Sequence, residues 1–129
     1  MRSLNVLMAS WEDLAEEIFR QTIEGGGHRL TIINPWNGEI EFLEEARTGG
    51  YDVILLTNLG LPWCFVRGLI APCSRARDAN VIVVSGHIDE DMRMGASREG
   101  AVGYYPLPLQ PGQLLGAVEA AAEGAVIIV

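Results

Sequence analysis

Short apolar runs alternate with amphipathic stretches along the whole 129-residue chain. The runs are largely apolar and rich in β-branched residues, a pattern that predicts buried strands. They are LNVLMA (4–9), HRLTIIN (28–34), DVILLT (52–57), VIVVSG (81–86) and AVGYY (101–105). Strands of this kind are typical of a parallel sheet that is covered on both faces.

The stretches between these runs predict helices. Apolar residues recur at helical spacing from Leu14 to Ile23, until the three glycines at 25–27 end the pattern. Further amphipathic stretches are 39–47, 89–100 and 111–124. The weakest segment is 63–80, where we expect a helix from Phe65 to Ile70 that ends at Pro72. Strands that alternate with helices predict an α/β fold with a doubly wound parallel sheet.

Composition and charge narrow the function further. A chain of this length forms one domain, which we place at 1–124, followed by the apolar tail AVIIV at 125–129. The net charge of −8 argues against binding to nucleic acid or to an anionic membrane. All nine basic side chains are arginines, so no chemistry that needs a lysine is available.

Localisation and cysteine chemistry follow from what the sequence shows. The segment lacks a secretory leader and an apolar run of membrane-spanning length, which predicts a cytoplasmic protein. Cys64 and Cys73 are nine positions apart and match neither a metal pair nor a redox pair. We expect both to be small buried side chains. His28 opens the second predicted strand, and we expect it to be exposed to solvent.

Three segments in order carry a resemblance to a known family. They are YDVILLTNLGLP, VIVVSGHIDEDM and REGAVGYYPLPLQPGQLL, the last with Gly100, Ala101, Tyr104 and Pro108 in the pattern GA–x–x–Y–x–x–K–P. Over residues 4 to about 123 the chain resembles the CheY-like receiver domains of response regulators in bacterial two-component (phosphorelay) signalling. This resemblance implies a five-stranded parallel sheet of order 2-1-3-4-5, with its site at the carboxyl ends of the strands.

The family's functional groups can be compared with this chain position by position. A receiver needs two acids that bind Mg²⁺ after strand 1, and an aspartate that accepts the phosphoryl group after strand 3. It also has a Thr or Ser that ends strand 4, and a Lys before the last proline. The corresponding residues here are Ala9 and Ser10 for the acids, Thr57 or Asn58 for the aspartate, Ser85 for the Thr or Ser, and Leu107 for the lysine.

Four of the five functional groups of a receiver are therefore missing at the corresponding positions of this chain, and only Ser85 is kept. Glu12 and Asp13 follow closely, but acids at that place are explained by capping of the next helix. The resemblance thus implies a pseudo-receiver that is not an enzyme, is not phosphorylated and has no Mg²⁺ site or other cofactor. Tyr104 corresponds to an aromatic residue that moves between exposed and buried positions in active receivers. Here it is either held in one position or an ordinary residue at a strand end.

The tryptophans are a separate clue that does not depend on the family. Trp11, Trp36 and Trp63 each come shortly after one of the first three predicted strands, so they share the sheet edge at which open α/β folds bind ligands. One interpretation is that each indole packs locally as a lid over the former site. The other is that partly exposed indoles anchor a partner or a flat ligand.

These observations favour a signalling module that acts by binding another protein. A homodimer could form through the face made by helix 4 (89–100), strand 5 (101–105) and helix 5 (111–124). Two alternatives stay open. One is an unconventional phosphoacceptor at Thr57 or Asn58, and the other is a small-molecule sensor that uses the tryptophan-rich edge.

Overall fold

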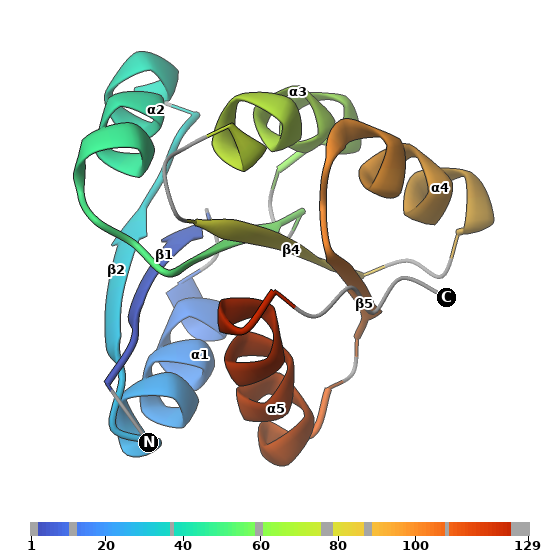
Figure 1. Ribbon diagram of the computed structural model, residues 1–129. Coiled ribbons are helices and arrows are strands. Elements are labelled where there is room, and N and C mark those ends of the chain that lie inside the picture. The colour runs from blue at the N-terminus through green and yellow to red at the C-terminus, as the bar shows by residue number, and fades with distance from the viewer. Residues whose placement is uncertain are drawn as a thin grey trace.

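The protein forms one five-stranded parallel sheet with helices on both faces (Figure 1). The computed structural model describes residues 3–10, 13–36, 38–58, 61–75, 79–86, 89–107 and 109–124. The strands are β1 (Asn5–Ala9), β2 (Arg29–Ile33), β3 (Val53–Thr57), β4 (Asn80–Ser85) and β5 (Gly103–Pro106). Their order is β2-β1-β3-β4-β5 and each neighbouring pair is parallel, so the expected fold class and strand order are confirmed.

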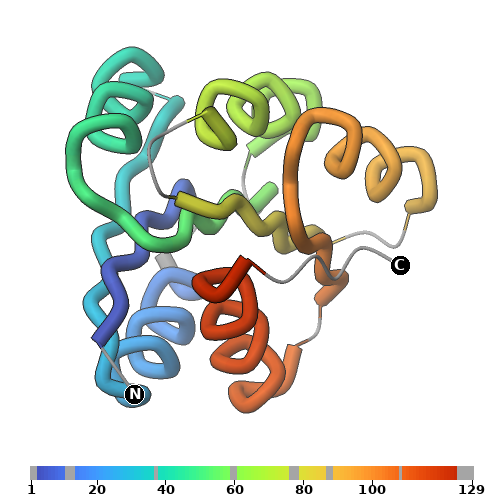
Figure 2. The backbone as a smooth tube through the Cα atoms, viewed as in Figure 1, coloured from blue at the N-terminus to red at the C-terminus, as the bar shows by residue number. Residues whose placement is uncertain are grey.

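The helices form the two outer layers. They are α1 (Asp13–Gly25), α2 (Glu39–Thr48), α3 (Trp63–Ser74), α4 (Glu90–Glu99) and α5 (Pro111–Ala122). Helices α1 and α5 lie side by side on one face of the sheet, and α2, α3 and α4 cover the other (Figures 1 and 2). Trp11 and the tail at 125–129 lie outside the described residues, so the predictions made for them stay predictions.

Alternation along the central strand divides the core into two parts. All five side chains of β3 are fully buried. Ile54 and Leu56 pack with α2 and α3, whereas Val53 and Leu55 pack with α1 and α5. Burial of one such side chain contributes about 1.5–3 kcal/mol. Because both faces of β3 are covered, the strand is suited to its central place in the sheet.

Helix α3 is longer than the sequence indicates. The expectation that Pro72 ends it is wrong, because the helix continues to Ser74 with Pro72 inside its last turn. A proline there removes only one helical hydrogen bond, and its ring is exposed rather than wedged into the core. Ile70 and Cys73 are fully buried on either side of it, and their packing holds the last turn in place.

The junction of α3 with α4 depends on one glycine. Gly100 ends α4 with φ +112°, in the left-handed region that favours glycine. A Cβ at this position would lie 2.6 Å from Oγ of Ser74, which itself donates to the backbone oxygen of Glu99 at 3.3 Å. Any other residue here would therefore be strained both in its backbone and in its contacts.

The prediction that His28 is exposed is wrong. Its exposed fraction is 5% because the start of β1 and the end of α5 cover it. The ring Nδ1 accepts a hydrogen bond from the backbone N–H of Leu4 at 3.1 Å, and Nε2 lies 2.9 Å from Oε2 of Glu119. Since Nδ1 acts as an acceptor, the ring proton is on Nε2 and is donated to Glu119. The imidazole thus links β1, β2 and α5.

Candidate functional site

Strands β1, β3 and β4 end together at the centre of the sheet. The register aligns Ala9 with Leu56, and Thr57 with Val84, so the strand ends form what we call the carboxyl edge. Ala9, Ser10, Thr57 and Ser85 are all buried there, with exposed fractions of 1% or less. The structure therefore brings together the residues that the sequence comparison assigned to the receiver site.

The polar groups at this edge bind neighbouring backbone. Thr57 Oγ1 donates to the carbonyl oxygen of Ala9 at 2.9 Å, which joins the ends of β3 and β1. Asn58 is partly exposed, and its Oδ1 accepts the backbone N–H of Gly86 at 3.0 Å. The Asn58 N–H donates in turn to the carbonyl oxygen of Val84 at 3.3 Å. At this edge, therefore, these polar groups form hydrogen bonds that connect the ends of adjacent strands.

Leu107 follows β5 and takes part in the edge through its backbone only. Its N–H donates to the carbonyl oxygen of Ser85 at 2.8 Å. Its side chain packs with the apolar cluster on the α1 and α5 side of the sheet. A lysine at this position would bring a cation toward the site, whereas Leu107 brings an apolar contact to the neighbouring layer.

Aromatic residues surround the same edge. Trp36 is 47% exposed and meets the Phe65 ring edge-on, with ring centroids 5.1 Å apart. Trp63 is partly buried and meets Tyr104 edge-on at 6.3 Å. Tyr104 is 7% exposed, and its hydroxyl donates to Sδ of Met92 at 3.7 Å. Thus Tyr104 is held in a buried position by neighbours from α3 and α4.

Comparison with solved structures shows which fold this arrangement of strands and helices belongs to. No family model matches the sequence, and no curated protein matches it. Among solved structures, a CheY-like receiver domain from Methanospirillum hungatei JF-1 matches with a TM-score of 0.81 at 18% identity, covering 95% of this chain and 96% of that one. A response regulator from Thermotoga maritima matches with a TM-score of 0.77 at 18% identity, covering 95% and 99%. This chain has the receiver fold.

A third match carries a metal. The receiver domain of sensor histidine kinase PA1611 from Pseudomonas aeruginosa PAO1 matches with a TM-score of 0.74 at 15% identity, covering 95% of this chain and 99% of that one. That structure is described with a magnesium ion coordinated in its active site cleft. Within the described part of this chain, no group of three or more His, Cys, Asp or Glu residues could hold a metal ion.

The receiver fold here also has an apolar cleft that the sequence did not indicate. It lies between α1 and the segment leading into α5, with a volume of about 270 Å³. Its lining residues are Ala15, Ile18, Phe19, Thr22, Leu107, Leu109, Pro111 and Leu114. The regular apolar spacing from Leu14 to Ile23 was the available signal, but Leu14 and Ile18 are 71% and 57% exposed rather than buried.

The two cysteines of α3 differ in burial. Cys64 is exposed, so the expectation that both cysteines are buried is wrong for it and confirmed for Cys73. Burial raises the pKa of the Cys73 thiol to about 12.

None of the helices in the described ranges is long and apolar enough to cross a membrane.

Proposed function

We propose that this protein is a receiver-like signalling module that binds a protein partner and does not depend on phosphorylation. The observation that supports it most is the hydrogen bond from Thr57 Oγ1 to the carbonyl oxygen of Ala9. The Thr57 hydroxyl, at one of the two positions that correspond to the nucleophile of a receiver, is buried and bound to backbone. It has neither the charge nor the freedom of a phosphoacceptor carboxylate.

The neighbouring positions support the same proposal. Mg²⁺ requires near-octahedral oxygen ligands and is usually held by one or two carboxylates. Ala9 has no donor in its side chain, and Ser10 and Thr57 offer only hydroxyls. These residues do not fit the magnesium site of an active receiver. We therefore propose a binding role rather than an enzymatic one.

The fixed aromatic residues indicate how such a module could work. Tyr104 meets Trp63 edge-on and donates to Sδ of Met92, and these contacts support a surface of α4 and β5 that keeps one arrangement. A partner would then recognise a constant shape, and control would lie in the partner's availability. A homodimer through α4, β5 and α5 is one form of this proposal, and sedimentation equilibrium would test it.

The test is exposure to small phosphodonors. We expect acetyl phosphate or beryllofluoride with Mg²⁺ to leave the amide NMR spectrum and the intact mass unchanged. An active receiver treated in parallel is the positive control. A covalent phosphoryl adduct on Thr57 or Asn58, or shifts confined to the ends of β1 and β3, would reject the proposal. Such a result would favour the unconventional phosphoacceptor instead.

A further inference from the structure

Three helix N-termini lie next to one another at the carboxyl edge, and their first turns differ. Helices α2, α3 and α4 form one layer, with α3 packed against both neighbours. The first turn of α2 carries Glu39 and Glu41, and that of α4 carries Glu90 and Asp91. The first turn of α3 has no acid and begins with Trp63 instead. Aromatic side chains therefore occupy the middle position between two acidic turns.

We call the four rings of Trp36, Trp63, Phe65 and Tyr104 the aromatic strip. Trp36 meets Phe65 on the α2 side of α3, and Trp63 meets Tyr104 on the α4 side. The strip reaches α4 through the contact of Tyr104 with Met92. Met92 follows Asp91 in the first turn of α4, and Trp36 precedes Glu39 of α2 by three positions, so each of the two ring pairs lies on the side of α3 that faces one acidic turn. Trp36 gives it an exposed face.

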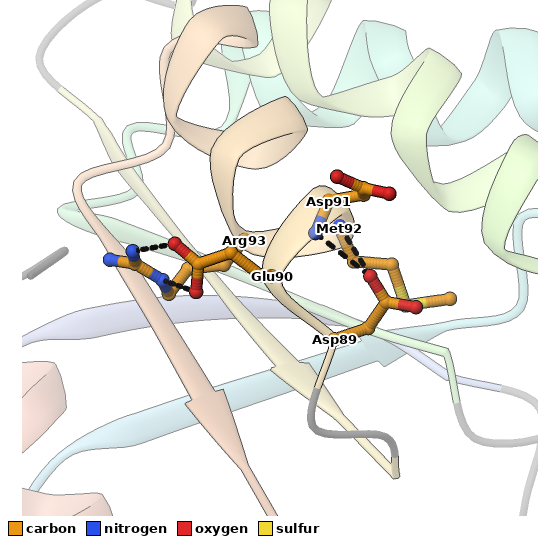
Figure 3. Close-up of polar contacts among 5 residues, drawn as sticks. All are labelled: Asp89, Glu90, Asp91, Met92 and Arg93. Atoms are coloured by element: carbon orange, nitrogen blue, oxygen red, sulfur yellow. Dashed lines mark hydrogen bonds and ion pairs between the residues drawn. The ribbon is translucent and has the colours of Figure 1, made fainter.

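The acids beside the strip are only partly neutralised. Glu90 pairs with Arg93, and Asp89 Oδ1 accepts the backbone N–H groups of Asp91 and Met92 (Figure 3). Within the described ranges, Glu39, Glu41 and Asp91 are exposed and have no ion-pair partner.

The sign of the local charge follows from the sizes of the opposing contributions. Five carboxylates stand beside the strip, and Arg93 balances one of them. Each helix N-terminus contributes roughly half a positive charge. Three such termini offset fewer than half of the four remaining carboxylates, so the surface stays negative. The net charge of −8 on the whole chain adds attraction for cations at longer range.

We propose that the aromatic strip and its two acidic turns bind an arginine- and lysine-rich segment of the partner protein. An exposed indole attracts a guanidinium or ammonium group to its face, and flanking carboxylates hold the neighbouring cations. The charge of the surface selects this occupant over a neutral or acidic one. This inference rests on the proposed function, because it names the partner chemistry of the same phosphorylation-independent module.

The probe for this proposal is a synthetic octapeptide of alternating arginine and glycine, with a glutamate and glycine peptide as its control. We expect the arginine peptide to shift the Trp36 indole N–H and the amides of the first turns of α2 and α4. Binding should weaken as salt is added, because exposed charges are screened. The glutamate peptide should produce no shift.

Variants then separate the aromatic contribution from the charge. Trp36→Leu keeps the net charge, and we expect it to weaken peptide binding about two- to fivefold. Glu39→Gln with Glu41→Gln should weaken binding and reduce its salt dependence. Glu16→Gln with Glu17→Gln on α1 is the matched control for charge, and it should have the smaller effect. Circular dichroism confirms that each variant is folded.

Three results would overturn the proposal. The first is equal weakening by the α1 pair and the α2 pair, which would mean that the peptide senses only overall charge. The second is unchanged affinity in Trp36→Leu. The third is a neutral aromatic compound that binds at the strip while the arginine peptide does not, which would indicate a small-molecule sensor. None of them would touch the phosphodonor test, so the two proposals can fail independently.

Discussion

The two ends of the sheet use their polar side chains differently. At the amino end, side chains join elements far apart in the sequence. The bonds are His28 with Leu4 and Glu119, Asp52 Oδ2 with the Asn5 N–H at 2.9 Å, and Asn80 Nδ2 with the Ala121 carbonyl oxygen at 2.8 Å. At the carboxyl edge, Thr57 and Asn58 bond to the ends of adjacent strands, and Trp36 stays half exposed.

If the carboxyl edge binds a partner as proposed, this difference separates stability from recognition within one small domain. The bonds at the amino end join α5 and the starts of four strands, β1, β2, β3 and β4, to one another. At the carboxyl edge the side-chain bonds of Thr57 and Asn58 join only the ends of neighbouring strands, and no helix is held by them. Exposed aromatic and acidic side chains can therefore gather at that edge with little effect on folding. Substitutions at the two ends should differ accordingly.

The largest effect is expected for Thr57→Asp, which places an acid at one of the two positions that correspond to the aspartate of an active receiver. Thr57 is fully buried, and neither Ala9 nor Ser10 can bring a cation to a new carboxylate. An unpaired buried charge destabilises by several kcal/mol or raises its own pKa until it is neutral. We expect the free energy of unfolding at neutral pH to fall by about 3 kcal/mol, as measured by urea denaturation. Phosphorylation should not be gained.

Asn58→Asp is the matched control for that variant. Its side chain is partly exposed, and a carboxylate oxygen can still accept the Gly86 N–H. The loss should therefore be about 1 kcal/mol or less. If Thr57→Asp were as mild as Asn58→Asp, the carboxyl edge would be more open to water than the burial of Thr57 indicates.

A smaller effect is expected for His28→Leu at the amino end. The change leaves the buried Leu4 N–H without its acceptor and Glu119 without its donor. Leaving such groups unsatisfied destabilises by about 1–3 kcal/mol, measurable by urea denaturation. Glu119→Gln is the control, because an amide oxygen can still accept from Nε2. Equal losses in the two variants would mean that the charge of Glu119, rather than the hydrogen bonds, matters.

Much of the fold could be predicted from the sequence because strand and helix patterns are local. The runs at 52–57 and 81–86 are apolar throughout, and only a covered parallel sheet buries such segments. The predicted end of α3 at Pro72 was wrong because a proline disrupts a helix less when its ring lies on the exposed face, as it does here. The prediction for His28 was wrong because the glycines before it say nothing about Glu119 of α5, which covers it from ninety-one positions later in the sequence.

The candidate site was predictable in its composition and less so in its contacts. The resemblance located Ala9, Ser10, Thr57 and Ser85 at one edge, and the structure brings them together there. It left open which of Thr57 and Asn58 takes the nucleophile's place. In the structure Thr57 is the last residue of β3, whereas Asn58 follows the strand and ties two loops. Such details depend on side-chain directions that no spacing in the sequence encodes.

The two cysteines of α3 lie near opposite ends of the sheet, Cys64 near the carboxyl edge and Cys73 near the amino end. Cys64 lies exposed in the first turn, and Cys73 lies buried in the last, where burial raises the pKa of its thiol from 9.0 to about 12. Above pH 9 the unfolded chain loses this proton while the folded chain keeps it. Stability should therefore fall as pH rises from 9 toward 12, by up to about 1.4 kcal/mol per pH unit.

Urea denaturation of the parent chain and of Cys73→Ala across this pH range isolates that contribution. The variant should lack the part of the alkaline slope that belongs to Cys73. The slopes from Tyr51 and Tyr105, whose pKa values burial also raises, should remain in both chains. In the native protein a thiol reagent should modify Cys64 quickly and Cys73 slowly. Equal reaction rates would show that the last turn of α3 opens readily.

The smallest effect on stability is expected for Trp36→Leu at the carboxyl edge. The indole is already 47% exposed, and its described ring contact is with Phe65. An aromatic pair of this kind contributes about 0.5–1.5 kcal/mol, and leucine restores part of the apolar contact. The free energy of unfolding should therefore fall by less than about 1 kcal/mol, below the loss for His28→Leu. A larger loss would mean that Trp36 is part of the packing that holds α2 to α3, and the separation of stability from recognition would no longer hold at this residue.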